Sequence, residues 1–240
     1  MDITKTKHGL RMSQHGTVIS ELRTSPGPTD SVADILAGLI CVLKPEGRIG
    51  VLGFAGGGMQ APLCALGVEA KVDAVDLDRV GYDLFRWHCP EWVRRVRWKK
   101  ADAVKWLRAQ PANFDLIVED LSVPSEGDVF KPAITWDVLP PLIRDRLAPG
   151  GIAVFNLLPP PGGVWLRERN RMARIFGDAR LVSFDDFTNH ILVAGRSVPP
   201  VRELGKMLRH ALRTIGSVQA ERIRLRTVRG SRPTVGRVLF

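Results

Sequence analysis

Between Arg48 and Gly195 the sequence alternates between short apolar runs rich in β-branched residues and longer segments with helical periodicity. Such a short run is typical of a buried strand, whereas apolar residues three and four positions apart indicate an amphipathic helix. Strands that alternate with helices form a parallel sheet whose two faces are covered by the helices. The sequence therefore predicts an α/β fold built on a doubly wound, mostly parallel sheet.

The last two apolar runs of this region indicate how the sheet ends. They lie within residues 179–186 and 189–196 and are separated by only a few residues. So short a connection forces two strands to pair in antiparallel orientation. A parallel sheet that ends in an antiparallel hairpin is the layout of the class I S-adenosylmethionine-dependent methyltransferase fold, and we expect seven strands in it.

The chain divides into three segments by pattern and charge. Residues 1–30 predict a short β segment of two strands, residues 31–195 the methyltransferase-like core, and residues 196–240 a helix followed by a strand. The last segment holds ten Arg and one Lys against two Glu, so it carries nine of the +10 net charge. It is a solvated face, a surface for nucleic-acid phosphates, or a contact with an acidic partner or with a second copy in a homodimer.

A glycine-rich turn follows the first strand of the core. The stretch "RIGVLGFAGGGMQAPL", residues 48–63, holds Gly53 and then Gly56, Gly57 and Gly58 in front of a helical segment. Glycine lets a ligand approach the backbone closely and leaves amide groups exposed at the start of a helix. A tight turn between a strand and a helix produces the same pattern without a ligand, so the neighbouring residues must decide.

Acidic residues follow the next three strands. Asp76 ends the second strand, Asp102 follows the third, and Asp120 ends the fourth. Ligands of open α/β sheets bind at the carboxyl ends of the strands, and an acid after the second strand can accept hydrogen bonds from ribose hydroxyls. Asp102 either receives an adenine amino group or caps the helix that it precedes. The set as a whole indicates a nucleoside site.

These motifs resemble those of the polyamine aminopropyltransferases, the spermidine synthase family, over roughly residues 45–195. The matching pieces are the turn at 53–58, "VDLD" at 75–78, "ADA" at 101–103, "FDLIVEDLSVP" at 114–124 and "VFKPAITW" at 129–136. Members of that family transfer an aminopropyl group from decarboxylated S-adenosylmethionine to an amine. The resemblance therefore implies S-adenosylmethionine, or its decarboxylated form, as the cofactor.

The resemblance also implies a role for each matching position. Gly53 and Gly57 would lie under the tail of the donor, Asp76 would bind the ribose and Asp102 the adenine. Asp120 would be the catalytic base that deprotonates the attacking amine. The remaining cofactor-site residues are Ala55, Gly56, Leu77 and Ala103, and the residues on the substrate side are Ser122, Val123 and Trp136.

Departures from the family pattern concentrate on the amine side. Gly56 replaces the aspartate of the loop, Val123 replaces the second carboxylate of a D-x-x-D pair, and Tyr82 is the one tyrosine of the chain. A missing carboxylate removes a partner that offsets the cost of desolvating an ammonium group. We therefore expect a smaller, less acidic acceptor pocket and favour methyl transfer. Aminopropyl transfer and nucleoside binding without catalysis are the alternatives.

The sequence also bears on where the protein works. Its first residues lack the apolar core of a signal peptide, and the longest apolar stretch, residues 32–43, is too short to cross a membrane. Cys41, Cys64 and Cys89 show neither metal-ligand nor disulfide spacing. We expect a cytoplasmic enzyme that acts on a small-molecule acceptor, without a metal and without a membrane partner.

Overall fold

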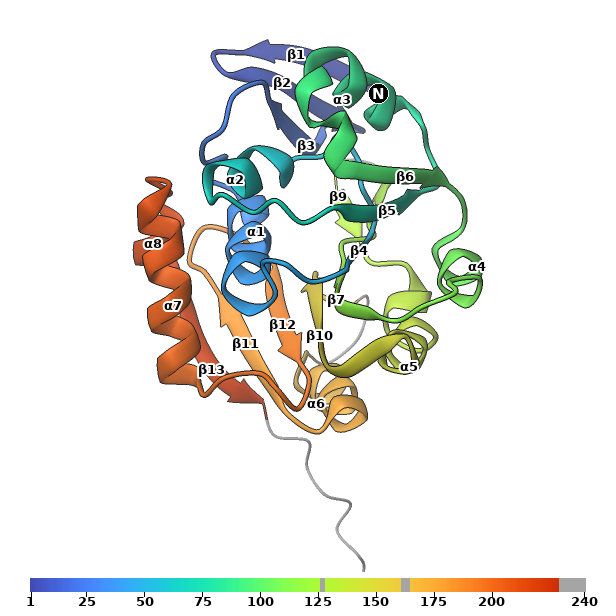
Figure 1. Cartoon of the computed structure of the whole chain (residues 1–240), viewed down its shortest axis with the longest axis vertical. Helices are drawn as coiled ribbons and strands as arrows, with labels where there is room; N and C mark the ends of the chain where they lie inside the picture. Colours follow the sequence, from blue (N-terminus) through green and yellow to red (C-terminus); the bar gives the residue numbers. More distant parts are fainter. Residues whose placement is uncertain (126–127, 161–164, 229–240) are drawn as a thin grey trace, which may run out of the picture.

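The computed structural model describes residues 1–125, 128–160 and 165–228, and its centre is one large sheet (Figure 1). In spatial order the strands are β13 (Arg224–Val228), β11 (Ala179–Ser183), β12 (His190–Ala194), β10 (Leu147–Leu157), β7 (Phe114–Glu119), β4 (Ile49–Leu52), β5 (Val72–Asp76) and β6 (Val96–Lys100). The strands from β10 to β6 are parallel, and β12, β11 and β13 are antiparallel to their neighbours. The predicted α/β fold with its terminal hairpin is confirmed, and β13 adds an eighth strand.

Helices cover both faces of this sheet. One face carries α1 (Val32–Leu43), α2 (Gln60–Ala65), α3 (Val80–His88), η1 (Pro90–Arg95), α7 (Val201–Thr214) and α8 (Gln219–Arg222). The other face carries α4 (Ala103–Arg108), η2 (Ala133–Thr135), α5 (Leu139–Asp145) and α6 (Trp165–Phe176). The core strands are therefore apolar on both sides, which explains their unbroken apolar runs. In β4, for example, Val51 packs toward the α1 side and Leu52 toward the α4 side.

The N-terminal segment forms a small sheet of its own. Its strands are β1 (Asp2–Thr6), β2 (Gly9–Gln14) and β3 (Thr17–Arg23), all antiparallel, where the sequence predicted two. Met12 and Leu22 are buried, and a side chain added at Gly56 would meet Met12 and Ser20. The small sheet therefore lies directly against the glycine turn. A two-stranded ribbon of β8 (Val123–Ser125) and β9 (Asp128–Phe130) follows β7.

The C-terminal segment is joined to the core along its described length. Helix α7 runs beside α1 (Figure 1), and any side chain at Gly38 would meet Leu208. The buried carboxylate of Asp34 accepts hydrogen bonds from Thr29 and from the Ser217 hydroxyl, which is 2.6 Å away. Arg224 of the basic strand lies 2.9 Å from Asp185. Part of the basic charge is thus paired within the protein, and the arginines beyond Val228 lie outside the described residues.

In the ranges that the structure describes, every helix is too short or too polar to cross a lipid bilayer.

Candidate functional site

The glycine turn after β4 is fixed by Asp76, the last residue of β5. One carboxylate oxygen of Asp76 accepts hydrogen bonds from the backbone amides of Phe54, at 2.9 Å, and Ala55, at 2.8 Å. Gly53 and Ala55 have positive φ angles of 89° and 44°. A side chain at Gly53 would lie 2.6 Å from the carbonyl oxygen of Asp120, so only glycine fits there. The turn therefore brings the ends of β4, β5 and β7 together.

A cavity of about 360 Å³ opens over this turn. Of the residues predicted to bind the cofactor, Gly53, Ala55, Asp76, Leu77, Asp102 and Ala103 line it. Gly56 and Gly57 are not among its lining residues, because Gly56 faces the small N-terminal sheet and Gly57 packs against the rings of Phe54 and Phe85. The structure thus gathers most of the predicted nucleoside-site residues around one cavity.

Asp102 lies at the rim of this cavity and also caps a helix. Its side chain accepts a hydrogen bond from the backbone amide of Lys105 at 2.9 Å, which is the N-cap interaction of α4. A carboxylate has several acceptor positions, so the cap leaves Asp102 able to accept a further donor from the cavity. Both roles considered from the sequence are therefore compatible with its placement.

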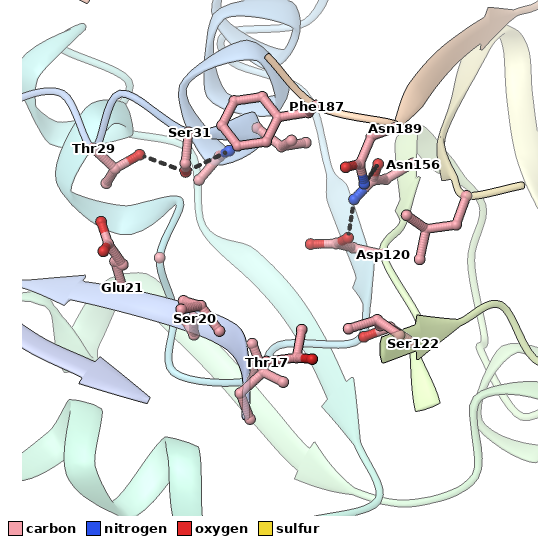
Figure 2. Close-up of a pocket in the computed structure, with 18 of the residues that line it drawn as sticks. Thr17, Ser20, Glu21, Thr29, Ser31, Asp120, Ser122, Asn156, Phe187 and Asn189 are labelled. Atoms are coloured by element: carbon pink, nitrogen blue, oxygen red, sulfur yellow. Dashed lines mark hydrogen bonds between the residues drawn. The ribbon is translucent and has the colours of Figure 1, made fainter. Parts of the chain in front are cut away.

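A second cavity of about 680 Å³ lies beside the first. It is enclosed by β3, the segment before α1, the residues after β7 and β10, and the loop before β12 (Figure 2). The two cavities share Ile19, Ala55, Asp120, Leu121 and Ser122 in their linings. Figure 2 shows the carboxylate of Asp120 pointing into the second cavity, across from Thr17, Ser20 and Glu21 of β3. Asp120 therefore lies where the two cavities meet.

A chain of side-chain amides fixes the orientation of Asp120. The Asn156 side-chain amide donates to the Asp120 carboxylate at 2.7 Å, and Asn189 donates to the Asn156 side-chain oxygen at 2.9 Å (Figure 2). Burial raises the pKa of Asp120 above its usual range, and the nearby Lys131 and the Asn156 hydrogen bond oppose that rise. Our sequence interpretation missed both asparagines. Asn156 is a polar residue in the apolar run of β10, near the carboxyl end of the strand. That interruption is the feature of the sequence from which Asn156 could have been predicted as a site residue.

A buried ion pair lies next to Asp120. The Lys131 ammonium is 3.0 Å from a carboxylate oxygen of Glu119, and both side chains are inaccessible to solvent. The other Glu119 oxygen accepts a hydrogen bond from the Thr135 hydroxyl at 2.8 Å. Burial raises the pKa of Glu119, and the charge of Lys131 opposes that rise. Lys131 also lines the second cavity, so this pair forms part of its wall.

The second cavity carries an excess of acidic side chains. Its charged lining residues are Glu21, Asp30, Asp120 and Asp128 against Arg11 and Lys131. Arg11 is already 2.6 Å from Glu21, and Lys131 is paired with Glu119. The valine at position 123 therefore does not leave the second cavity without acidic side chains. Carboxylates from the N-terminal sheet and from β9 supply the acidity, and no spacing motif in the sequence links them.

The three residues predicted on the substrate side lie in different places. Ser122 lines both cavities, and Val123, half exposed, lines the cavity over the glycine turn. Trp136 lines neither cavity, because its ring is buried against Trp165, with the ring centres 6.5 Å apart and nearly perpendicular. The structure thus brings Ser122 next to Asp120 and directs Trp136 into the packing between α5 and α6.

Comparison with known proteins shows that this chain is similar in fold to several solved structures. No protein-family model and no curated protein sequence matches the chain. The solved structure of human methyltransferase-like protein 13 in complex with SAH has 17% identity and a TM-score of 0.57, over 75% of this chain and 90% of that one. Spermidine synthase from Thermotoga maritima has 13% identity and a TM-score of 0.62, over 82% of this chain and 69% of that one.

This chain has the class I methyltransferase fold. A further spermidine synthase, in complex with the transition state analogue AdoDATO, has 12% identity and a TM-score of 0.61, over 88% of this chain and 72% of that one. The fold implied by the spermidine synthase-like motifs is therefore confirmed. In this class I methyltransferase fold, the glycine turn and Asp76 lie at the carboxyl ends of β4 and β5.

The packing of α3 under the glycine turn leads to a stability prediction. Replacing a helical glycine with alanine normally stabilises a helix by about 1 kcal/mol. At Gly81 of α3, however, the added methyl group would overlap the carbonyl oxygen of Ala55. We expect Gly81→Ala to lower the free energy of unfolding by about 1–3 kcal/mol, measured by urea denaturation.

The matched control is Gly205→Ala in α7. There the nearest atom to the new methyl group is at the far end of the long Arg209 side chain, at 3.0 Å, and not in the backbone. We expect that variant to be as stable as the parent protein or slightly more stable. Equal stability of the Gly81→Ala variant and the parent would show that α3 does not support the turn in this way.

Proposed function

We propose that this protein is a transferase that moves an alkyl group from an S-adenosylmethionine-type nucleoside to an amine, with Asp120 as the base. The observation that carries the proposal is the position of Asp120 in the walls of both cavities. A general base must come within hydrogen-bond reach of the proton that it removes. A donor in the first cavity and an acceptor in the second would meet at this carboxylate.

The first cavity has the chemistry needed by the nucleoside. Asp76 uses one oxygen for the turn, and among the described residues its other oxygen accepts one hydrogen bond, from the Asp78 amide at 3.2 Å. That oxygen can accept hydrogen bonds from ribose hydroxyls. Leu77 is 67% exposed beside it and offers an apolar surface for an adenine ring. When bound, such a nucleoside would supply an electrophilic carbon attached to its sulfonium.

The second cavity suits an amine that arrives as a cation. Its acidic side chains exceed its basic ones, so an ammonium group would be attracted electrostatically. Asp120 would take a proton from the ammonium, which frees the nitrogen lone pair for attack on the electrophilic carbon. As the new C–N bond forms, the C–S bond breaks and its electron pair stays on sulfur. The raised pKa of Asp120 makes it a better proton acceptor than an ordinary aspartate.

We place methyl transfer first, because Val123 occupies the position of the second carboxylate in the aminopropyltransferase pattern. Aminopropyl transfer is the second candidate and has an observation of its own in its favour. Of the described residues that line the first cavity, none is a lysine or an arginine that would pair with the carboxylate of S-adenosylmethionine. The decarboxylated donor needs no such partner.

A transfer assay tests the role of Asp120. The purified protein is supplied with S-adenosylmethionine and a panel of amines, and separately with decarboxylated S-adenosylmethionine and putrescine. We expect Asp120→Asn to lower kcat/KM by about 10²–10⁴-fold while the affinity for S-adenosylhomocysteine, measured by calorimetry, stays within a factor of about three. The control Asp83→Asn changes an exposed carboxylate of α3 and should leave both values unchanged.

The outcomes separate the alternatives. Spermidine formation that is abolished by Asp120→Asn would replace methyl transfer by aminopropyl transfer. Nucleoside binding without any transfer would favour a binding protein. An Asp120→Asn variant that keeps full activity would remove Asp120 from the reaction.

The pKa of Asp120 predicts a pH dependence. Because the base acts as a carboxylate, activity falls as the pH drops through its pKa, which lies above the usual aspartate value. Asn156→Leu removes a hydrogen bond that lowers this pKa, so we expect the acid limb of kcat/KM to move to higher pH. Asn113→Leu, on an exposed turn, is the control. An acid limb that Asn156→Leu leaves in place would assign that limb to another group.

A further inference from the structure

Two loops form part of the wall of the second cavity. The α1 loop, residues 29–31, precedes α1, and the hairpin loop, residues 184–189, joins β11 to β12. All of the α1 loop and residues 187–189 of the hairpin loop line the cavity (Figure 2). The two loops are far apart in the chain, so tertiary contacts must fix their relative position.

The side chain of Gln219, the first residue of α8, bridges these two loops. Its amide nitrogen lies 2.9 Å from the carbonyl oxygen of Asp30, in the α1 loop, and 3.2 Å from the carboxylate of Asp186, in the hairpin loop. A side-chain amide has two N–H donors, so one donor can serve each loop. Gln219 is fully buried and lines neither cavity, so it joins the two loops from outside the cavity.

The residues next to Gln219 also hold the α1 loop. Asp30 has a φ angle of 57°, a left-handed conformation that is uncommon outside glycine. The backbone amide of Val218 donates to the Asp30 carboxylate at 3.0 Å. The Ser217 hydroxyl donates at 2.6 Å to the Asp34 carboxylate, which also accepts from the Asp30 amide at 2.9 Å. The amide, the carbonyl and the carboxylate of Asp30 are thus each bound, two of them directly by the C-terminal segment.

The hairpin loop extends from this bridge to the residues around the base. Asn189, the last residue of the loop, donates to Asn156, which in turn donates to Asp120. Asn156 belongs to β10, which is paired with strands on both sides, so its position does not depend on the loop. A displacement of the hairpin loop would therefore change the wall of the cavity more than the orientation of Asp120.

We propose that Gln219 and Ser217 are positioning residues for the acceptor, because they hold the α1 loop and the hairpin loop together around the second cavity. This inference rests on the proposed function, which assigns that cavity to the acceptor. Both side chains are neutral and buried. The C-terminal segment therefore has a role in the reaction that does not depend on its basic charge.

Acceptor kinetics of the full chain test the role of Gln219. With the amine that the transfer assay identifies, we expect Gln219→Leu to raise the KM for that amine about tenfold, as for one lost hydrogen bond to a charged group. The value of kcat and the affinity for S-adenosylhomocysteine should stay close to those of the parent, because Gln219 lines neither cavity and does not touch Asp120.

The matched control is Gln110→Leu, beside α4 on the opposite face of the sheet from α8. The Gln110 side chain also joins two partners, the Arg48 guanidinium at 2.9 Å and the Trp106 carbonyl at 3.1 Å. We expect that variant to keep the KM of the parent even if its Tm falls as far as that of Gln219→Leu. Ser217→Ala is a smaller change, which should raise the same KM about threefold if Gln219→Leu fails to fold.

Amide hydrogen exchange tests the bridge in the absence of nucleoside and amine. In the Gln219→Leu variant, or in Ser217→Ala in its place, peptides that cover residues 27–34 and 184–190 should exchange faster than in the parent. Peptides from β4 and β7 should exchange at the rate of the parent.

The proposal is overturned if both loop peptides exchange as in the parent, or if the KM for the amine rises no more than in the Gln110→Leu variant. A fall in kcat with an unchanged KM would also overturn it. A parent protein that transfers no group to any amine would refute the proposed function, and the exchange measurement would still decide whether these residues position the two loops.

Discussion

The carboxylate of Asp76 is the interaction on which the site depends. By accepting hydrogen bonds from two successive amides of the turn, it holds Ala55 in a left-handed conformation that a non-glycine residue seldom adopts. Gly53 of this turn packs closely against the backbone carbonyl of Asp120, and the carbonyl of Ala55 packs closely against Gly81 of α3. Ala55 lies in the walls of both cavities. One side chain at the end of β5 thus positions the boundary between the two cavities.

Charge in the second cavity is arranged in two layers. Deepest is the pair of Glu119 and Lys131, which neutralises itself inside the protein and whose cation stabilises the ionised form of Asp120. Above it, Asp120 faces the cavity with its orientation set by Asn156. Burial raises the pKa of Asp120, and the charge of Lys131 and the hydrogen bond from Asn156 oppose that rise. In the proposed reaction, this balance favours Asp120 as the residue that takes the proton of the amine.

Much of the fold followed from local patterns. Apolar runs between helical segments predicted the parallel sheet, and the short link between residues 186 and 189 predicted the antiparallel hairpin. The alternation of "RLRTV" predicted a strand, but not its place as the eighth strand of the sheet, because its partner β11 lies about 45 residues earlier in the chain. The acidic lining of the second cavity has no local sequence signal for the same reason. Glu21, Asp120 and Asp128 come from three separate strands or loops that only the tertiary structure brings together.

A crystal structure of the protein with S-adenosylhomocysteine would show where the donor lies relative to Asp120. We expect adenosine in the cavity over the glycine turn, ribose hydroxyls on Asp76, and the sulfur turned toward Asp120 and the second cavity. A nucleoside bound elsewhere, or with its sulfur turned away from Asp120, would exclude Asp120 as the base of the transfer.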